Sequence, residues 1–203
     1  MFKHIYNKRY WGDQESVSGP GSSIGQTVAI RRELPRIINE HGIKSMIDAP
    51  CGDLHWMRHL LAQLDITYVG GDIVDDVVAR ASHAYTGTNA EFRTFDITTD
   101  AFPDVDLWLC RDVLFHLSYK RIDMALRNFT RSNVKFILLT THSEPTITNR
   151  NIATGDFRRL DFFKAPFNIP PSIVVDRFDD FAPPAEPREM IMIRREDLAT
   201  MLE

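Results

Sequence analysis

Three aspartates, Asp48, Asp72 and Asp96, stand at the ends of successive strand-like runs of the chain. Asp72 lies twenty residues after Gly52, close to the spacing at which an acid holds ribose hydroxyls in nucleotide-binding sheets. A carboxylate suits this task because it can accept hydrogen bonds from both hydroxyls of a vicinal diol. Each acid alone could simply cap the helix that follows it. Three acids at successive strand ends favour a ligand site instead.

The turn after the first of these strands indicates which ligand the site would take. It reads Asp48-Ala49-Pro50-Cys51-Gly52-Asp53 and contains one glycine. Dinucleotide-binding folds use G-x-G-x-x-G there, because the glycines let the backbone approach a pyrophosphate. An additional acid would repel phosphate but would attract an amine or a cation. The turn therefore favours S-adenosylmethionine, which carries an amine and a sulfonium, over NAD. We expect Cys51 to pack within the turn rather than to act as a nucleophile.

Two histidines and one acid are candidates for catalysis. Methyl transfer to a hydroxyl requires a group that accepts the hydroxyl proton. His116 is the first candidate, because it lies four residues after Asp112 and a helical turn would place both side chains on one face. His142, just past a later strand-like run, is the second. Two alternatives stay open: His116 could be a buried packing residue, or the three side chains could bind a divalent metal. We interpret the site as one without a metal, since the spacing does not demand one.

Four residues are expected to contact the methyl acceptor: Tyr10, Trp11, Ser22 and Arg158. Trp11 lies in a glycine-rich arm before the core, and Arg158 lies in a later segment that we interpret as a lid. An arginine in a lid could clamp a phosphate or a carboxylate of the acceptor. A solvated surface charge is the alternative for Arg158.

The order of the expected elements predicts how these residues come together. The apolar periodicity predicts strands and helices that alternate from residue 44 onward. Expected strands cover residues 44–49, 66–71, 91–95, 105–110, 134–140, 173–177 and 189–193, and expected helices cover 26–41, 53–63, 74–81, 119–130 and 195–202. This alternation predicts an α/β fold, a Rossmann-like three-layer sandwich around a seven-stranded, mostly parallel sheet with an antiparallel last strand. Pro35 predicts a kink or a restart in the first helix.

A length of 203 residues predicts one domain over residues 1–203. We divide it into an N-terminal arm and helix (1–43), a cofactor-binding core (44–140), a substrate lid (141–171), and a C-terminal hairpin with a short helix (172–203). Within the arm, glycine and proline predict a loop over residues 1–25. Loops as long as the lid are usually functional or disordered, and its phenylalanines favour an ordered cover.

Composition restricts the partners and the compartment. A net charge of -4 argues against a dedicated nucleic-acid binder. No apolar run of the sequence approaches the roughly 20 residues that span a membrane, and the first residues lack a secretory signal. Two cysteines do not make a disulfide framework. These features predict a cytoplasmic protein that acts on a small molecule; a homodimer stays open.

The sequence resembles the class I S-adenosylmethionine-dependent methyltransferases in stretches 47–53, 68–73, 95–97 and 106–117, within residues 44–140. The resemblance implies that Asp72 with Ile73 binds ribose and that Asp96 with Ile97 lies beside adenine. It further implies that the methionine end is held by the turn and the fourth strand, through Asp48, Ala49, Pro50, Cys51, Gly52 and Arg111. Pro50 replaces the first glycine common in such turns, which predicts a stiffer turn.

Two further stretches, 18–22 and 154–158, resemble a small methyltransferase subfamily associated with bacterial surface-glycan gene clusters. This resemblance implies O-methylation of a hydroxyl or phosphate on a sugar, a nucleotide sugar or a glycan. Two alternatives stay open. One is an NAD-linked nucleotide-sugar oxidoreductase, which the absence of G-x-G-x-x-G and Tyr-x-x-x-Lys disfavours. The other is a non-catalytic cofactor-binding protein of the same fold.

Overall fold

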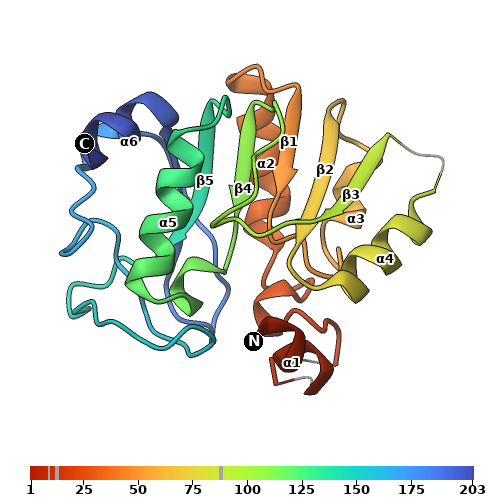
Figure 1. Cartoon of the computed structure of the whole chain (residues 1–203), viewed down its shortest axis with the longest axis horizontal. Coiled ribbons are helices and arrows are strands. Elements are labelled where there is room, and N and C mark those ends of the chain that lie inside the picture. Colours follow the sequence, from red (N-terminus) through yellow and green to blue (C-terminus); the bar gives the residue numbers. More distant parts are fainter. Residues whose placement is uncertain (9, 12–13, 87–88) are drawn as a thin grey trace.

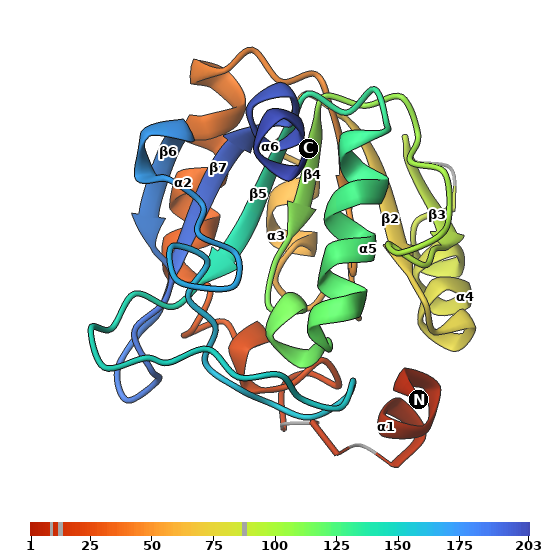
Figure 2. The same cartoon turned by 60° about the vertical axis from the view of Figure 1, so that its left-hand side comes forward.

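The computed structural model describes residues 1–8, 10–11, 14–86 and 89–203, which form one seven-stranded sheet flanked by helices (Figures 1 and 2). The strand order is β3-β2-β1-β4-β5-β7-β6. The strands are β1 (Ser45–Asp48), β2 (Thr67–Asp72), β3 (Ala90–Thr94), β4 (Leu107–Cys110), β5 (Phe136–Thr141), β6 (Val174–Asp179) and β7 (Glu189–Arg194). β7 is antiparallel to both of its neighbours, and the pairs among β1 to β5 are parallel. The predicted Rossmann-like sheet is confirmed.

The strand order places a change of direction in the middle of the sheet. From β1 the chain proceeds outward to β2 and β3, and it then returns to β4 on the other side of β1. The connections that leave the carboxyl ends of β1 and β4 therefore diverge and leave a crevice between them. Open α/β sheets bind their ligands at such a point. The sequence places Asp48 and Arg111 at these two strand ends.

The two faces of the sheet are covered by different helices. Side chains alternate along a strand, so neighbouring residues of β1 enter different cores. Ile47 packs in the core beneath α5 (Tyr119–Thr130) and α6 (Arg195–Leu202). Met46 packs in the core beneath α2 (Val28–Glu40) and α3 (Arg58–Leu61), which also includes Ala81 of α4 (Asp75–Ala84). The expected bounds of α5 and α6 are reproduced.

Pro35 does not interrupt the first core helix. α2 is continuous from Val28 to Glu40, so the predicted restart near Leu34 is wrong. Proline removes one backbone donor from a helix. The burial of Leu34 and Ile37, both fully inaccessible, holds the helix together in spite of that loss.

The expected helix over 53–63 is reduced to a single turn, α3 (Arg58–Leu61). Gly52 and Leu54 have φ angles of 56° and 57°, which belong to the left-handed region and cannot continue a right-handed helix. The side chain of Asp53 accepts hydrogen bonds from Ser16 and from the backbone of Val17. Contacts with the N-terminal arm therefore replace helix formation in this stretch.

The arm itself contains an unexpected helix, α1 (Phe2–Lys8), so the loop predicted for residues 1–25 is wrong at its start. Phe2, Ile5 and Tyr6 follow the i, i+3, i+4 pattern, but the pattern is too short to stand out in the sequence. No residue of α1 is buried, and Lys3 forms an exposed ion pair with Asp75 of α4. Short 3-10 turns lie at Pro20–Ser22, Leu114–His116 and Pro171–Ile173.

Among the described residues, no helix has both the length and the apolar character that crossing a membrane requires.

Candidate functional site

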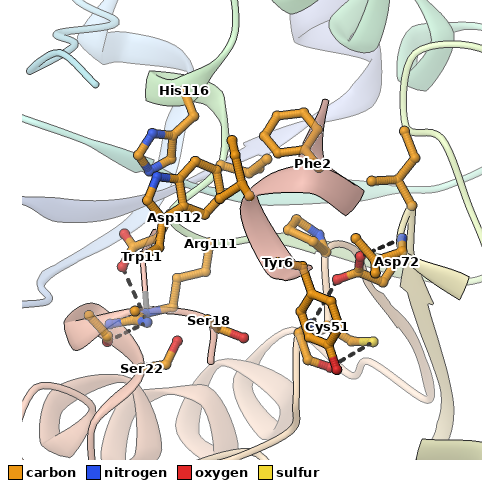
Figure 3. Close-up of a pocket in the computed structure, with 18 of the residues that line it drawn as sticks. Phe2, Tyr6, Trp11, Ser18, Ser22, Cys51, Asp72, Arg111, Asp112 and His116 are labelled. Atoms are coloured by element: carbon orange, nitrogen blue, oxygen red, sulfur yellow. Dashed lines mark hydrogen bonds and ion pairs between the residues drawn. The ribbon is translucent and has the colours of Figure 1, made fainter. Parts of the chain in front are cut away.

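A cavity of about 640 Å³ opens at the carboxyl ends of β1, β2 and β4, at the crevice in the middle of the sheet. A volume of this size suits a cofactor together with a small molecule. Figure 3 shows Cys51 and Asp72 toward one end of this main cavity and Trp11 beside His116 toward the other. Phe2, Ile5 and Tyr6 of α1 also line it, so the N-terminal helix covers part of the opening.

Asp72 is fixed by the backbone around it. Its two carboxylate oxygens accept hydrogen bonds from the N–H of Gly52 at 3.1 Å and of Val74 at 2.9 Å. Burial raises the pKa of Asp72 to about 6, although these bonds oppose the shift. The carboxylate thus joins the turn after β1 to the end of β2, and it lines the main cavity together with Ile73.

Asp48 is a buried acid at the end of β1, only 3% exposed. Its carboxylate accepts a hydrogen bond of 2.8 Å from the hydroxyl of Tyr68 on the neighbouring strand β2. Burial raises the pKa of Asp48 to about 7. The carboxyl group still lines the main cavity and can receive a cation there.

The turn after β1 is held from both sides. The N–H of Ala49 donates to Leu109 on β4, and the N–H of Cys51 donates to Gly71 on β2. Pro50, Cys51 and Gly52 line the main cavity, whereas Ala49 is fully buried and is absent from its lining. Burial raises the pKa of the Cys51 thiol well above its usual value, which suits a packing residue.

Asp96 and Ile97 line the same side of the cavity as Ile73. One oxygen of Asp96 accepts hydrogen bonds from the backbone N–H and the hydroxyl of Thr98. Asp96 therefore caps the turn that follows β3, and the apolar side chains of Ile73 and Ile97 supply flat surface beside it.

Four charged side chains form a series of ion pairs on the other side of the cavity, in the order Asp180, Arg111, Asp112, Arg188, and all but Asp112 are buried. The successive contacts are 2.7, 3.3 and 3.2 Å. Arg111 also donates to the backbone carbonyl of Gly21, which ties the N-terminal arm to the end of β4. This series of ion pairs therefore connects the arm, β4 and the β6–β7 hairpin around the cavity.

Asp112 adopts a φ of 54°, which is unusual for a residue with a side chain. This conformation turns the carboxylate toward both Arg111 and Arg188. Burial alone would raise the pKa of Asp112, but the two guanidinium groups outweigh it and hold the pKa below its usual value. The predicted helical turn that carries both Asp112 and His116 is wrong, because the 3-10 turn begins only at Leu114.

His116 and His142 both line the main cavity and come from different elements. The Nδ1 atom of His116 lies 2.9 Å from the backbone carbonyl of Asp156. The Nδ1 atom of His142 accepts a hydrogen bond of 3.2 Å from the N–H of Leu160. Burial lowers the pKa of both imidazoles. Within the described residues, no group of three or more His, Cys, Asp or Glu side chains is arranged to hold a metal ion.

Three of the four residues expected to contact the acceptor line the main cavity: Tyr10, Trp11 and Ser22. Arg158 does not. It is 3% exposed, and its Nη1 donates to the backbone carbonyls of Phe115 and Leu117 behind the cavity wall. Its guanidinium also lies 5.3 Å from the ring of Tyr119. Arg158 therefore does not reach the main cavity, where an acceptor clamp would have to lie. Its guanidinium instead supports the turn that carries His116.

Several residues of the site were not predicted from the sequence. Arg188 and Asp180 stand in the proline-rich connection between the last two strands, where no local pattern marks a ligand. Phe157 was expected only as part of the lid cover, yet it lines the cavity. The residue is 51% exposed.

Comparisons with known proteins agree with this geometry. Residues 46–133 match the family model described as a methyltransferase domain. A search of curated proteins gives no match.

Solved methyltransferase structures share the fold at low sequence identity. Magnesium protoporphyrin IX methyltransferase from Synechocystis PCC 6803, with bound S-adenosylmethionine, has a TM-score of 0.66 at 13% identity, with 95% of each chain covered. An S-adenosylmethionine-dependent methyltransferase from Leishmania major has a TM-score of 0.68 at 15% identity, with 95% of this chain and 82% of that chain covered. The 1,6-didemethyltoxoflavin N1-methyltransferase of Burkholderia thailandensis, with bound S-adenosylhomocysteine, has a TM-score of 0.63 at 15% identity, with 83% and 78% covered.

At 13–15% identity, the similarity to these solved structures concerns the fold alone. The match of residues 46–133 to the methyltransferase family model indicates the activity. The oxidoreductase and non-catalytic alternatives are therefore set aside. The chain is an S-adenosylmethionine-dependent methyltransferase, with a methyltransferase domain over residues 46–133.

Proposed function

We propose that this enzyme methylates a hydroxyl group of a small molecule and that His116 is the general base. When bound, S-adenosylmethionine supplies a methyl group that is already activated on a sulfonium. The protein then has two tasks, which are to align the acceptor oxygen with that methyl group and to take its proton. The proposal rests on one difference between the two cavity histidines: the Nδ1 atom of His116 faces a backbone carbonyl, whereas the Nδ1 atom of His142 accepts from a backbone N–H.

The partner of His116 defines its tautomer. A backbone carbonyl can only accept, so the Nδ1 atom that lies 2.9 Å from Asp156 O carries the proton. In the neutral ring, Nε2 then has a free lone pair and can take a proton from a hydroxyl. Because burial lowers the pKa of His116 below 6.5, the ring is neutral at pH 7 and available as a base.

The partner of His142 defines the opposite tautomer. The Nδ1 atom accepts from the N–H of Leu160, so it carries the lone pair and the neutral ring has its proton on Nε2. His142 therefore presents a donor to the cavity and does not suit the role of base. Asp112 does not suit it either, because Arg111 and Arg188 keep its carboxylate ionised and weakly basic.

The acids of the cavity fit the amine and the sulfonium of S-adenosylmethionine. We assign the ribose to Asp72 and Ile73 and the adenine to the surface formed by Ile97 and the backbone beside Asp96. The methionine end then lies over Asp48 and the 50–52 turn, close to Arg111. Ala49 contributes only by holding the turn. Calorimetry with S-adenosylhomocysteine tests this assignment, and Asp72→Ala should weaken binding at least tenfold, as expected for the loss of hydrogen bonds to a charged group.

We further propose a sugar or a glycan-linked hydroxyl as the acceptor. Residues of both stretches that resemble the glycan-associated methyltransferases line the main cavity or support it. Ser18 and Ser22 line the main cavity, and in the second stretch the carbonyl of Asp156 fixes His116 while the N–H of Gly155 donates to its backbone carbonyl. Tyr10 and Trp11 supply flat surface on which a sugar ring can lie.

The proposal is tested by a methyl-transfer screen over sugars and nucleotide sugars, each paired with its amino analogue. Formation of S-adenosylhomocysteine gives the rate, and mass spectrometry identifies the methylated atom. An O-methyl product is expected, with a fall in kcat of about 10²- to 10⁴-fold for His116→Gln and a much smaller fall for His142→Gln. Exclusive N-methylation, or full activity of His116→Gln, would contradict the proposal.

A further inference from the structure

Arg188 lines the acceptor side of the main cavity. It precedes β7 and is 7% exposed. Its Nε atom lies 3.2 Å from Asp112, close enough for an ion pair, but Nε and Nη2 are both buried without a hydrogen-bond partner in the described part of the chain. A buried guanidinium with unmade hydrogen bonds is costly unless another group completes them.

The neighbouring acids do not satisfy Arg188. The carboxylate of Asp112 is shared with Arg111 and accepts a further hydrogen bond from the hydroxyl of Thr140. Asp180 receives the Nε of Arg111, and toward Arg188 it offers only a backbone N–H, which donates to the Arg188 carbonyl. Glu186 also lines the cavity, and its carboxylate lies 3.8 Å from the Nε of Arg159. The series of ion pairs therefore ends in the Arg188 cation at the cavity.

His142 directly follows β5, and Arg188 directly precedes the neighbouring β7. β5 and β7 are antiparallel and pair Thr141 with Glu189, so His142 and Arg188 lie one residue beyond that pair on each strand. Residues opposite each other in such a pair point to the same face. Both side chains line the main cavity, and the proton on Nε2 makes His142 a donor there as well. Two donors therefore converge from adjacent strand ends.

An aromatic wall connects this pair to the proposed base. The ring of Phe157 lies 5.8 Å from the imidazole of His116 and 6.4 Å from that of His142. Phe115 contacts both histidines, at 4.6 and 5.4 Å. A ring that packs on Phe157 could thus place a hydroxyl at His116 while it directs a second substituent toward His142 and Arg188.

We propose that Arg188 and His142 bind an anionic group of the acceptor, so that the substrate is a hydroxyl compound that also carries a carboxylate or a phosphate. This inference rests on the proposed O-methylation and narrows its substrate class. A guanidinium recognises either anion through paired hydrogen bonds, and the imidazole N–H adds a third donor. The anion completes the hydrogen bonds that Arg188 lacks within the protein.

The test compares three sugars that differ in charge. Protein saturated with S-adenosylhomocysteine is titrated by calorimetry with D-glucuronate, D-glucose 6-phosphate and D-glucose. At least one acid should bind ten times or more tightly than glucose, and the comparison of the two acids distinguishes a carboxylate from a phosphate. Arg188→Gln should remove this advantage and leave glucose binding unchanged, whereas Arg188→Lys should retain part of it.

Further variants separate recognition from folding. His142→Gln keeps a side-chain donor and should bind the acid better than His142→Phe. Arg127→Gln removes a comparable positive charge from the exposed face of α5 and should behave as wild type. Unchanged affinity for S-adenosylhomocysteine in Arg188→Lys shows that the cavity is intact even if Arg188→Gln folds poorly.

Equal affinity for the three sugars, failure of both acids to bind, or an equal loss for all sugars in Arg188→Gln would overturn the anion site. Each result is distinguishable from failure of the proposed function. Methylation of neutral hydroxyl compounds that depends on His116 would keep O-methylation and refute the anion site. Selective acid binding that requires Arg188, without any O-methyl product, would keep the anion site and refute O-methylation.

Discussion

The indole of Trp11 is stacked on the imidazole of His116, with 4.3 Å between the ring centroids and 27° between the ring planes (Figure 3). The contact joins the N-terminal arm to the turn after β4. The other edge of His116 is held by the carbonyl of Asp156. The imidazole is therefore fixed in its plane by one segment and in its tautomer by another, which is the arrangement that a general base requires.

Trp11→Ala should reduce kcat by up to about tenfold, because a stacked aromatic pair contributes roughly 0.5–1.5 kcal/mol. The affinity for S-adenosylhomocysteine should change little, since Trp11 lies at the opposite end of the cavity from Asp72. Trp11→Phe keeps a stacking ring and should recover most of the rate. Steady-state kinetics with calorimetry would show this split, and a loss confined to cofactor affinity would contradict it.

The pH dependence of kcat/KM for the acceptor should report His116 when the enzyme is saturated with S-adenosylmethionine, because Asp48 and Asp72 are then already engaged by the cofactor. A base acts only when it is deprotonated, so activity should fall as the pH drops through the pKa of His116. Burial lowers that pKa below 6.5, so the rate should be nearly constant from pH 7 to 8 and decline only at lower pH. His116→Gln should remove the declining limb. A limb that persists in His116→Gln would assign it to another group, and His142→Gln serves as the matched control.

The sequence was sufficient to predict the sheet and much of the cofactor end, because those features are local. Period-2 apolar runs mark buried strands, and an acid at the end of a strand has to lie at the carboxyl edge of a parallel sheet. Asp48 and Asp72 could be placed by this reasoning alone. The positions of α5 and α6 followed from helical periodicity in the same way.

The acceptor end could not be predicted, because it is assembled from segments that are distant in sequence. Arg188 reaches the cavity only through the pairing of β5 with β7, and Asp112 faces it only through a left-handed backbone. Arg158 was expected at the acceptor for its charge, but the burial of its guanidinium against two backbone carbonyls depends on how the 142–170 segment folds back. Hydrophobic periodicity and short motifs do not indicate contacts between segments that are distant in the sequence.

Asp53 should control the attachment of the N-terminal arm. Its carboxylate accepts hydrogen bonds from the hydroxyl of Ser16 at 2.9 Å and from the N–H of Val17 at 2.9 Å. Asp53→Ala should free the arm, because it removes hydrogen bonds to a charged group that hold the arm in place. Binding of S-adenosylhomocysteine should then weaken by up to about tenfold. Calorimetry gives the affinity, with the exposed Asp65→Ala as the control. Unchanged affinity together with an arm still protected from proteolysis would refute this role.

Arg158→Met should destabilise the fold by about 2 kcal/mol, because it retains the apolar stem but leaves the carbonyls of Phe115 and Leu117 without their donor. Urea unfolding measures this loss, and Arg159→Met, at an exposed neighbouring position, is the control. The variant should keep the preference for acidic acceptors if Arg188 provides it. Wild-type stability combined with loss of that preference would return Arg158 to the acceptor site.

Asp48 should make the ligand-free protein less stable as the pH rises. The carboxyl group titrates near 3.8 in the unfolded chain and at about 7 in the folded protein, so the folded protein binds the additional proton between these values. The contribution of Asp48 to stability is therefore complete below about pH 4 and is lost as the pH rises through 7. Asp48→Asn carries no charge at any pH. Relative to wild type, it should gain stability between pH 4 and pH 8 by an amount on the order of 3–4 kcal/mol. Urea unfolding of both proteins at several pH values, without cofactor, measures the difference. A difference that does not change with pH would show that the carboxyl group at the end of β1 does not titrate as its burial requires.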